Sequence, residues 1–234
     1  MNILELEKEL KKIELKIFTT NDLVKFTGKE KNTINHFLSY QKKRNRIKQL
    51  KKGVYSFENI ENKFHLSKIF NETYISLNSA LEFYQMTTQR FNVLDLITKK
   101  PKKKTQIDEY KIEFTYTKHF FGFHKINVEG EEIFIANKEK VIIDCLLNLE
   151  KTSLEDIFTL IYHSNIDLDL LLHYLKKINS PTLNKRIGYL FSLKGINLDL
   201  QINNKYDLLN PLFPKNGKKN TQWKLYINEE IENG

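Results

Sequence analysis

The chain contains one cysteine, Cys145, in 234 residues. A single cysteine excludes an internal disulfide and is typical of a protein in a reducing compartment. Cys145 lies in the apolar segment VIIDCLL, residues 141–147. A small buried side chain is expected there, not a nucleophile.

Long apolar runs are also missing. No stretch approaches the roughly 20 residues that a helix needs to cross a bilayer. The first residues, MNILELEKELKKIELKIF, are amphipathic and mix both charges, without the apolar core or the cleavage site of a signal peptide. These absences predict a cytoplasmic protein with no membrane partner. Hydrophobic residues make up 40% of the chain, which is enough for buried cores.

The common catalytic motifs do not occur. Neither the GxGxxG nor the GxxxxGK[ST] phosphate-binding loop is present, and no serine lies in a GxSxG turn. Six histidines are scattered without the spacing of metal ligands: His36, His65, His119, His124, His163 and His173. Structural or loop roles are expected for the last four. The sequence therefore predicts no enzyme activity, no cofactor and no metal.

One segment leaves an enzymatic alternative open. Asp108, Glu109 and Lys111 form an acid-x-Lys pattern before a predicted strand, as in some metal-dependent nucleases. Such triplets are common in a chain with 29% charged residues, and no further acid is placed nearby by the sequence. A solvated start of the strand is the simpler interpretation.

What the chain does have is concentrated positive charge. Residues 25–52 contain ten Lys or Arg and one acid, Glu30, a local charge of +9 that equals the formal charge of the whole chain. A second run, KKPKKK at residues 99–104, adds five lysines, so the remainder is mildly acidic. Localised positive charge predicts a partner that carries phosphates.

The basic segment has the pattern of a helix followed by a hairpin. Thr27 and Glu30 fit a capping box, and an apolar stripe follows at helical spacing from Ile34 through Leu38. The opposite face carries side chains that can hydrogen-bond to bases or phosphates: Asn32, Thr33, Asn35, His36, Ser39 and Tyr40. Residues 46–50 and 54–57 alternate with period 2 around a turn at Gly53.

Two further helices are expected before this segment, one along residues 4–17 and a short one along residues 22–27, with Thr19 and Asp22 in capping positions. Together these elements predict a winged helix-turn-helix domain over residues 1–58. Its expected core is Leu10, Ile13, Leu23, Val24, Ile34, Phe37, Leu38, Ile47, Val54 and Tyr55.

Residues 59–234 predict a second domain of mixed α+β class, with antiparallel strands followed by a helical bundle. A helical connector is expected at residues 58–74 and a small-residue helix at 76–84. Strands are expected at residues 93–97, 110–116, 126–128, 133–135 and 223–227, and helices at 138–149, 153–163, 167–178 and 182–194. The lysine run at 99–104 is either a solvated loop, which is the commoner case, or a patch that contacts nucleic-acid phosphates.

Several segments, taken in order, resemble the AbiEi family of antitoxin-type transcriptional regulators of abortive-infection systems. NTINHFL at residues 32–38 and KKGVY at 51–55 resemble the DNA-binding part of that family. YISLNSAL at 74–81, FFGF at 120–123 and IANKEKVIID at 135–144 resemble its antitoxin domain. The lysine run at 99–104 is more basic than the family pattern.

The resemblance implies an autorepressor that binds inverted repeats in double-stranded DNA at its own promoter, as a monomer in solution or a dimer on DNA. The second domain would then counter a nucleotidyltransferase-type toxin. The alternative is a winged-helix regulator whose second domain binds a ligand or dimerises. The predicted DNA-binding residues are Lys31, Asn32, Thr33, Asn35, His36, Ser39, Tyr40, Lys42, Lys43, Arg44, Arg46, Lys48, Lys51 and Lys52.

Overall fold

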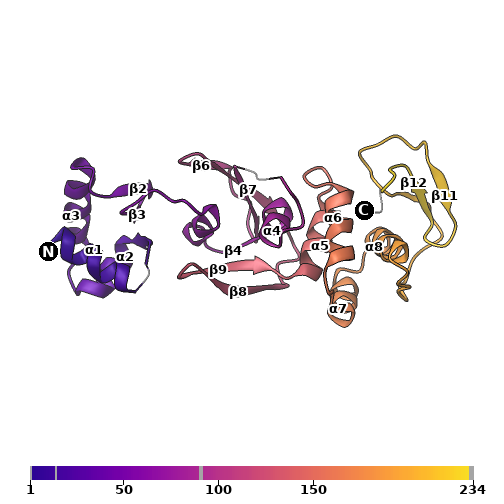
Figure 1. Cartoon of the computed structure of the whole chain (residues 1–234), viewed down its shortest axis with the longest axis horizontal. Helices are drawn as coiled ribbons and strands as arrows, with labels where there is room; N and C mark the ends of the chain where they lie inside the picture. The colour runs from indigo at the N-terminus through magenta and orange to yellow at the C-terminus, as the bar shows by residue number, and fades with distance from the viewer. Residues whose placement is uncertain (1, 14, 90–91, 232–234) are drawn as a thin grey trace. The chain divides into compact units, whose positions relative to one another are not determined.

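The computed structural model describes residues 2–13, 15–89 and 92–231 (Figure 1). Within these ranges the protein has nine helices and three sheets, so it is of the mixed α+β class that the sequence predicts. The chain divides into two compact units. One comprises Met1–Tyr74, Asn92–Tyr116 and Lys125–Phe134; the other comprises Ile75–Phe91, Thr117–His124 and Ile135–Gly234. No helix in the described ranges is long and apolar enough to span a membrane.

The first unit begins with an N-terminal module, residues 2–57, of three helices and three short strands. Its elements are α1 (Ile3–Lys12), β1 (Ile17–Thr19), α2 (Thr20–Thr27), α3 (Lys31–Lys43), β2 (Lys48–Lys51) and β3 (Val54–Ser56). The strands form a sheet in the order β1-β3-β2, with both pairs antiparallel. The helix, hairpin and turn predicted between residues 31 and 57 are all present.

Strand β1 replaces the end of the predicted first helix. Helix α1 ends at Lys12, and Ile17 pairs with Ser56 of β3. Pairing with β3 satisfies the backbone of this segment and buries Ile17 and Phe18. Ile13, which the helical pattern placed in the core, is 56% exposed because the chain leaves the helix there.

Of the two capping boxes that the sequence predicts at helix starts, one is present and one is not. The Thr19–Asp22 capping box is present, because the side chain of each residue bonds the backbone N–H of the other. The capping box expected at Thr27 is wrong: Thr27 ends α2, and its hydroxyl donates to the Leu23 carbonyl. Gly28 closes α2 at φ 65°, and Glu30 precedes α3 without a side-chain cap. The left-handed Gly28 turn occupies the place of the predicted cap.

The core of the module joins all three helices to the sheet. Leu10, Leu23, Ile34, Leu38 and Tyr55 are buried as predicted. Ile3, Leu6 and Phe18 belong to the same cluster but were not predicted, whereas Val24 and Phe37 are only partly buried against it.

A six-stranded sheet has the order β6-β7-β5-β4-β9-β8. Its strands are β4 (Thr73–Ile75), β5 (Val93–Thr98), β6 (Thr105–Ile107), β7 (Tyr110–Tyr116), β8 (Phe123–Val128) and β9 (Glu131–Ala136). The predicted antiparallel arrangement is wrong in part, since β5 pairs with β7 and β4 with β9 in parallel. Residues 94–98 of β5 are all buried, as is usual for a parallel strand covered on both faces.

The segment before β4, predicted as a helical connector, forms a 3₁₀ helix, η1 (Lys63–Ile69), and then enters the sheet. The lysine run forms the loop between β5 and β6, and β6 itself was not predicted.

The second unit contains the helices α4 (Leu77–Phe83), α5 (Lys138–Leu147), α6 (Leu154–His163), α7 (Leu168–Ile178) and α8 (Pro181–Leu193). Helix α5 contacts each of the other four, and α6 also contacts α8. A small sheet with the order β10-β12-β11 is formed by β10 (Asp207–Leu208), β12 (Leu225–Ile227) and β11 (Lys218–Asn220). The closing strand therefore begins at Leu225, two residues later than predicted. Trp223 lies so close to Gly188 of α8 that a Cβ there would come within 2.2 Å of its ring.

A buried polar cluster ties α4 to α5 in this unit. The Lys140 ammonium pairs with Asp144 one turn along α5, and Ser76 Oγ donates to the other Asp144 oxygen at 2.9 Å. Lys140 also lies over the Phe121 ring, and the Asn137 amide donates to the Gly122 carbonyl. Cys145, on the same helix, is buried as expected. Lys140 and Asp144 each neutralise a charge that would otherwise be buried alone.

Replacing Asp144 by alanine should destabilise the protein by about 3–5 kcal/mol, because it leaves the Lys140 ammonium buried without its carboxylate. Urea unfolding followed by circular dichroism measures the change. Glu150→Ala is the matched control, since this carboxylate is exposed just after the same helix. Equal stability of Asp144→Ala and Glu150→Ala would contradict the importance of the pair.

Candidate nucleic-acid interface

Helix α3 has one buried face and one exposed polar face. Ile34, Leu38 and Gln41 are buried and Phe37 is partly buried beside them, so the spacing of 3.6 residues per turn exposes the other positions of the helix. Every predicted residue on this helix is exposed: Lys31, Asn32, Thr33, Asn35, His36, Ser39, Tyr40, Lys42 and Lys43. The exposed face thus combines amide, hydroxyl, imidazole and ammonium groups.

Positive charge increases toward the end of α3. Lys42 and Lys43 lie in the last turn, where cations interact favourably with the helix dipole, and Arg44 and Arg46 follow, both exposed. The Arg44 guanidinium carbon lies 4.6 Å from the centre of the Tyr40 ring. Lys42 Nζ donates to Gln49 Oε1 at 2.6 Å, which links the helix to β2. These contacts orient two of the cations without neutralising them.

The β2–β3 hairpin carries the next cations at its turn. Lys51 and Lys52 are exposed, and Gly53 turns the chain at φ 78°, a conformation that other residues rarely adopt. The Thr20 amide donates to the Gly53 carbonyl at 3.1 Å, so the turn is tied to the start of α2. The hairpin tip is therefore held against the module and not left free.

Lys48 is placed differently from the other predicted residues. Its ammonium lies 2.6 Å from Asp108 Oδ1 and donates to Asn59 Oδ1 at 3.1 Å, and the side chain is only partly exposed. Asp108 is one of the acids in the nuclease-like pattern. No group of three or more His, Cys, Asp or Glu side chains with metal-binding geometry occurs in the parts of the chain that the structure describes.

A groove of about 1180 Å³ in the first unit joins the exposed start of α3 to the hairpin. Lys31 and Asn35 line it from α3, and Lys51 and Lys52 from the hairpin. It is also lined by Lys25 and Gln49, which the predicted site omitted. Lys25 belongs to the basic segment of residues 25–52, so its charge could have placed it in the predicted DNA-binding set.

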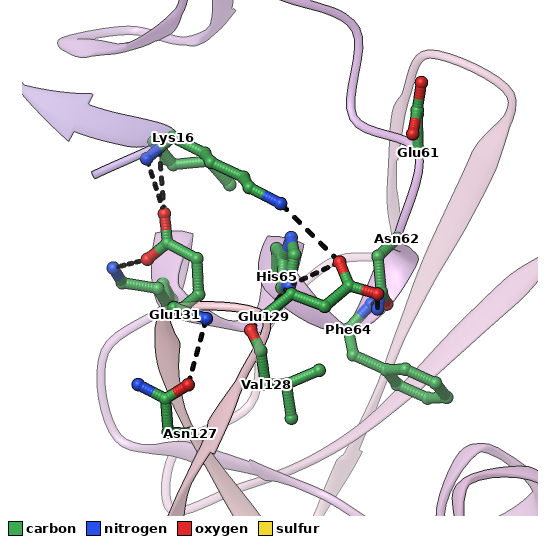
Figure 2. Close-up of polar contacts among 12 residues, drawn as sticks. Lys16, Glu61, Asn62, Phe64, His65, Asn127, Val128, Glu129 and Glu131 are labelled. Carbon is green, nitrogen blue, oxygen red and sulfur yellow. Dashed lines mark hydrogen bonds and ion pairs between the residues drawn. The ribbon is translucent and has the colours of Figure 1, made fainter. Parts of the chain in front are cut away.

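The start of β1 is anchored by a buried carboxylate, Glu131 of β9 (Figure 2). Glu131 Oε1 accepts from the backbone amides of Lys16 at 2.7 Å and Ile17 at 3.2 Å, and its other oxygen pairs with the Lys68 ammonium. Glu131 is 1% exposed, so the three donors replace its lost hydration. This contact fixes the edge strand of the sheet that carries the hairpin.

His65 lies beside this anchor and is 2% exposed. Its Nε2 lies 3.0 Å from the Val128 carbonyl and 3.6 Å from Glu129 Oε2 (Figure 2). Burial lowers the pKa of the His65 imidazole, and the Lys16 charge acts in the same direction, against the hydrogen bond to Val128 and the two nearby glutamates. His65 is therefore held in its neutral form more strongly than an exposed histidine.

The pKa of His65 is lower in the folded state than in the unfolded chain, so acid should destabilise the fold through this residue. Stability is fully present above the unfolded-state pKa of about 6.5 and falls as the pH decreases from there toward the folded-state pKa. We expect the free energy of unfolding of His65→Gln to vary less than that of the wild type between about pH 7 and pH 5. Urea unfolding at several pH values measures both.

His36→Gln serves as the control, because His36 is exposed on α3. Identical pH dependence for the wild type and His65→Gln would show that the buried imidazole does not contribute.

No family model matches the chain, and no curated protein matches it in sequence. Its function is therefore inferred from the exposed face of α3, the hairpin tip and their charge.

Proposed function

We propose that the N-terminal module is a winged helix-turn-helix that binds double-stranded DNA, with α3 as recognition helix and the β2–β3 hairpin as wing, and that the protein is a transcriptional repressor of its own promoter. The observation that carries this proposal is the exposed polar and basic face of α3, of which Lys31 and Asn35 share a groove with the lysines of the hairpin tip. A protein helix with such a face fits the major groove.

In this proposal, different residues of the module contact the bases and the phosphates. Asn32, Asn35 and His36 are short polar side chains on the first turns of α3, where a recognition helix contacts base edges. The cations at the end of α3 and on the hairpin suit phosphates, which fix position without reading sequence. Lys48 is the weakest of the predicted contacts, because Asp108 already neutralises it.

Binding to the DNA upstream of the gene should depend strongly on salt. If about six phosphates are neutralised, the slope of log K against log salt concentration is about −5. Asn35→Ala should relax sequence preference with little change in this slope, whereas Lys51→Gln with Lys52→Gln should weaken binding to every sequence and reduce the slope by about 2. Fluorescence anisotropy with specific and scrambled duplexes measures both quantities.

The double variant Lys176→Gln/Lys177→Gln is the matched control, since these adjacent lysines are exposed on α7. Salt-independent binding, or a control variant that loses as much affinity as the hairpin variant, would reject the proposed interface.

We further propose, from the resemblance to antitoxin-type regulators, that the predicted second domain, residues 59–234, counters a nucleotidyltransferase-type toxin. The support from the fold is that the resembling segments meet: Ser76, Lys140 and Asp144 form one buried cluster, and Phe121, from a third segment, packs its ring against Lys140. These segments would then form a hydrophobic and polar core shared with the antitoxin domains that they resemble. The surface that acts on the toxin would be formed by other residues.

Expression of the full chain should relieve growth arrest by a nucleotidyltransferase encoded beside its gene. The Lys51→Gln/Lys52→Gln variant should protect as well as the wild type, because the hairpin acts on DNA. Growth curves after induction of the toxin measure the effect. Continued arrest despite confirmed expression would favour the alternative, a regulator whose second unit binds a ligand or dimerises.

A further inference from the structure

A second basic site lies in the first unit, formed by the loop between β5 and β6 together with the hairpin. A pocket of about 540 Å³ is lined by four lysines, Lys51, Lys102, Lys103 and Lys104. Its other walls are Leu50, Phe70, Thr105, Ile107 and Phe114, so no acidic side chain lines it. Lys51 comes from the hairpin, whereas the other three lysines lie about fifty residues later in the chain.

The loop is held in place at its base. Thr98 Oγ1 donates to the Lys100 carbonyl at 2.8 Å, and the Lys99 amide donates to the Glu72 carbonyl at 3.3 Å. Below the pocket, Phe70 and Phe114 pack edge to face with centroids 4.9 Å apart, and Lys51 Nζ lies 4.9 Å from the centre of the Phe70 ring. A fixed base and an aromatic floor distinguish this loop from a lysine run that is merely solvated.

The five lysines of the run are not equivalent. Lys99 and Lys100 have the Glu72 carboxylate at 4.0 and 3.4 Å. Lys102, Lys103 and Lys104 form no ion pair with any residue that the structure describes, and Lys103 and Lys104 are exposed. Several like charges around one pocket repel one another, so an anion that enters it relieves the repulsion.

Lys51 also lines the groove that contains Lys31, Asn35 and Lys52. One lysine therefore borders both the proposed DNA groove and the second pocket, which makes the basic surface continuous from α3 through the hairpin to the loop. A polyanion bound along α3 can continue into the pocket, whereas a small free anion would need only one of the two sites.

We propose that Lys102, Lys103 and Lys104, with Lys51, bind backbone phosphates of the same DNA, beyond the base pairs that α3 contacts. This inference rests on the proposed function of the N-terminal module and adds a second point of attachment to it. The contact carries no sequence information, but it extends the bound length of DNA and fixes the position of the module on it.

The test uses the full chain and two duplexes, a short one limited to the segment bound by α3 and the hairpin, and a long one extended by about one helical turn, roughly 10 base pairs, on both sides. Lys103→Gln/Lys104→Gln removes two exposed charges of the pocket. Lys99→Gln/Lys100→Gln is the matched control, because it removes two charges from the same loop that Glu72 already pairs. Thermal unfolding establishes that both variants fold.

On the long duplex, Lys103→Gln/Lys104→Gln should reduce the salt slope by about 2, so that its affinity relative to the wild type changes about tenfold between about 50 and about 200 mM salt. On the short duplex it should match the wild type, and Lys99→Gln/Lys100→Gln should change either slope by much less. If Lys103→Gln/Lys104→Gln has the wild-type salt slope on the long duplex, the inference is overturned. This holds even if the variant binds inorganic phosphate more weakly than the wild type does, because the pocket would then take a small anion and not DNA.

An equal loss on both duplexes also overturns it, because the loop would then act on the segment that α3 contacts. In either case the proposed function stands as long as the wild type binds with a steep salt slope. If the wild type shows no salt-dependent binding to either duplex, the proposed function itself fails.

Discussion

Burial of Ile34 and Leu38 decides which side chains of α3 meet solvent. Both are fully buried, one turn apart, against the cluster that contains Leu10, Phe18 and Leu23. Truncating either residue to alanine would cost about 2–5 kcal/mol, more than any exposed contact on the helix can supply. The hydrophobic contact therefore sets the rotation of the helix, and the polar face follows from it.

A second constraint acts on the surface, where acids are paired selectively with lysines. Asp108 neutralises Lys48, and Glu72 lies beside Lys99 and Lys100. Lys51, by contrast, contacts an aromatic ring. Exposed ion pairs contribute little stability, about 0–1 kcal/mol each. Their larger effect is to leave positive charge concentrated at the hairpin tip and the adjoining loop while removing it from the flanks.

The sequence predicted what depends on short-range pattern. Three predicted features are present: the buried stripe of α3, the Gly53 turn and the Thr19–Asp22 capping box. Each of them depends only on residues that lie close together in the sequence. Strand β1 was missed because its partner, Ser56, is 39 residues away from Ile17 and no local period announces it. Thr27 fitted a capping box as well as Thr19 did, and only the left-handed turn at Gly28 decides between them.

The candidate site divides in the same way. The exposed set on α3 could be read from helical spacing, whereas the pairing of Lys48 with Asp108 depends on residues 60 positions apart. The lysine run was evident as composition, but its position next to Lys51 depends on the path of β5 through a parallel sheet. Spacing shows which residues share a face; only the tertiary fold shows which charges remain without a counter-charge.

Two ion pairs with a buried carboxylate show how the fold secures these arrangements. Glu131 with Lys68 fixes the start of β1, and Lys140 with Asp144 fixes α5 to α4 through Ser76. A buried pair is weak as a source of stability, because desolvation of both charges offsets most of their attraction. A shifted strand or helix would leave one of these carboxylates buried without its partner, and breaking a buried pair in this way is strongly destabilising. For β1 this matters directly: the strand pairs with β3, β3 forms the hairpin with β2, and the exposed lysines lie at the turn of that hairpin. The Glu131 carboxylate thus fixes β1 at one edge of the sheet, and β1 in turn supports the β2–β3 hairpin from which the proposed DNA contact is made.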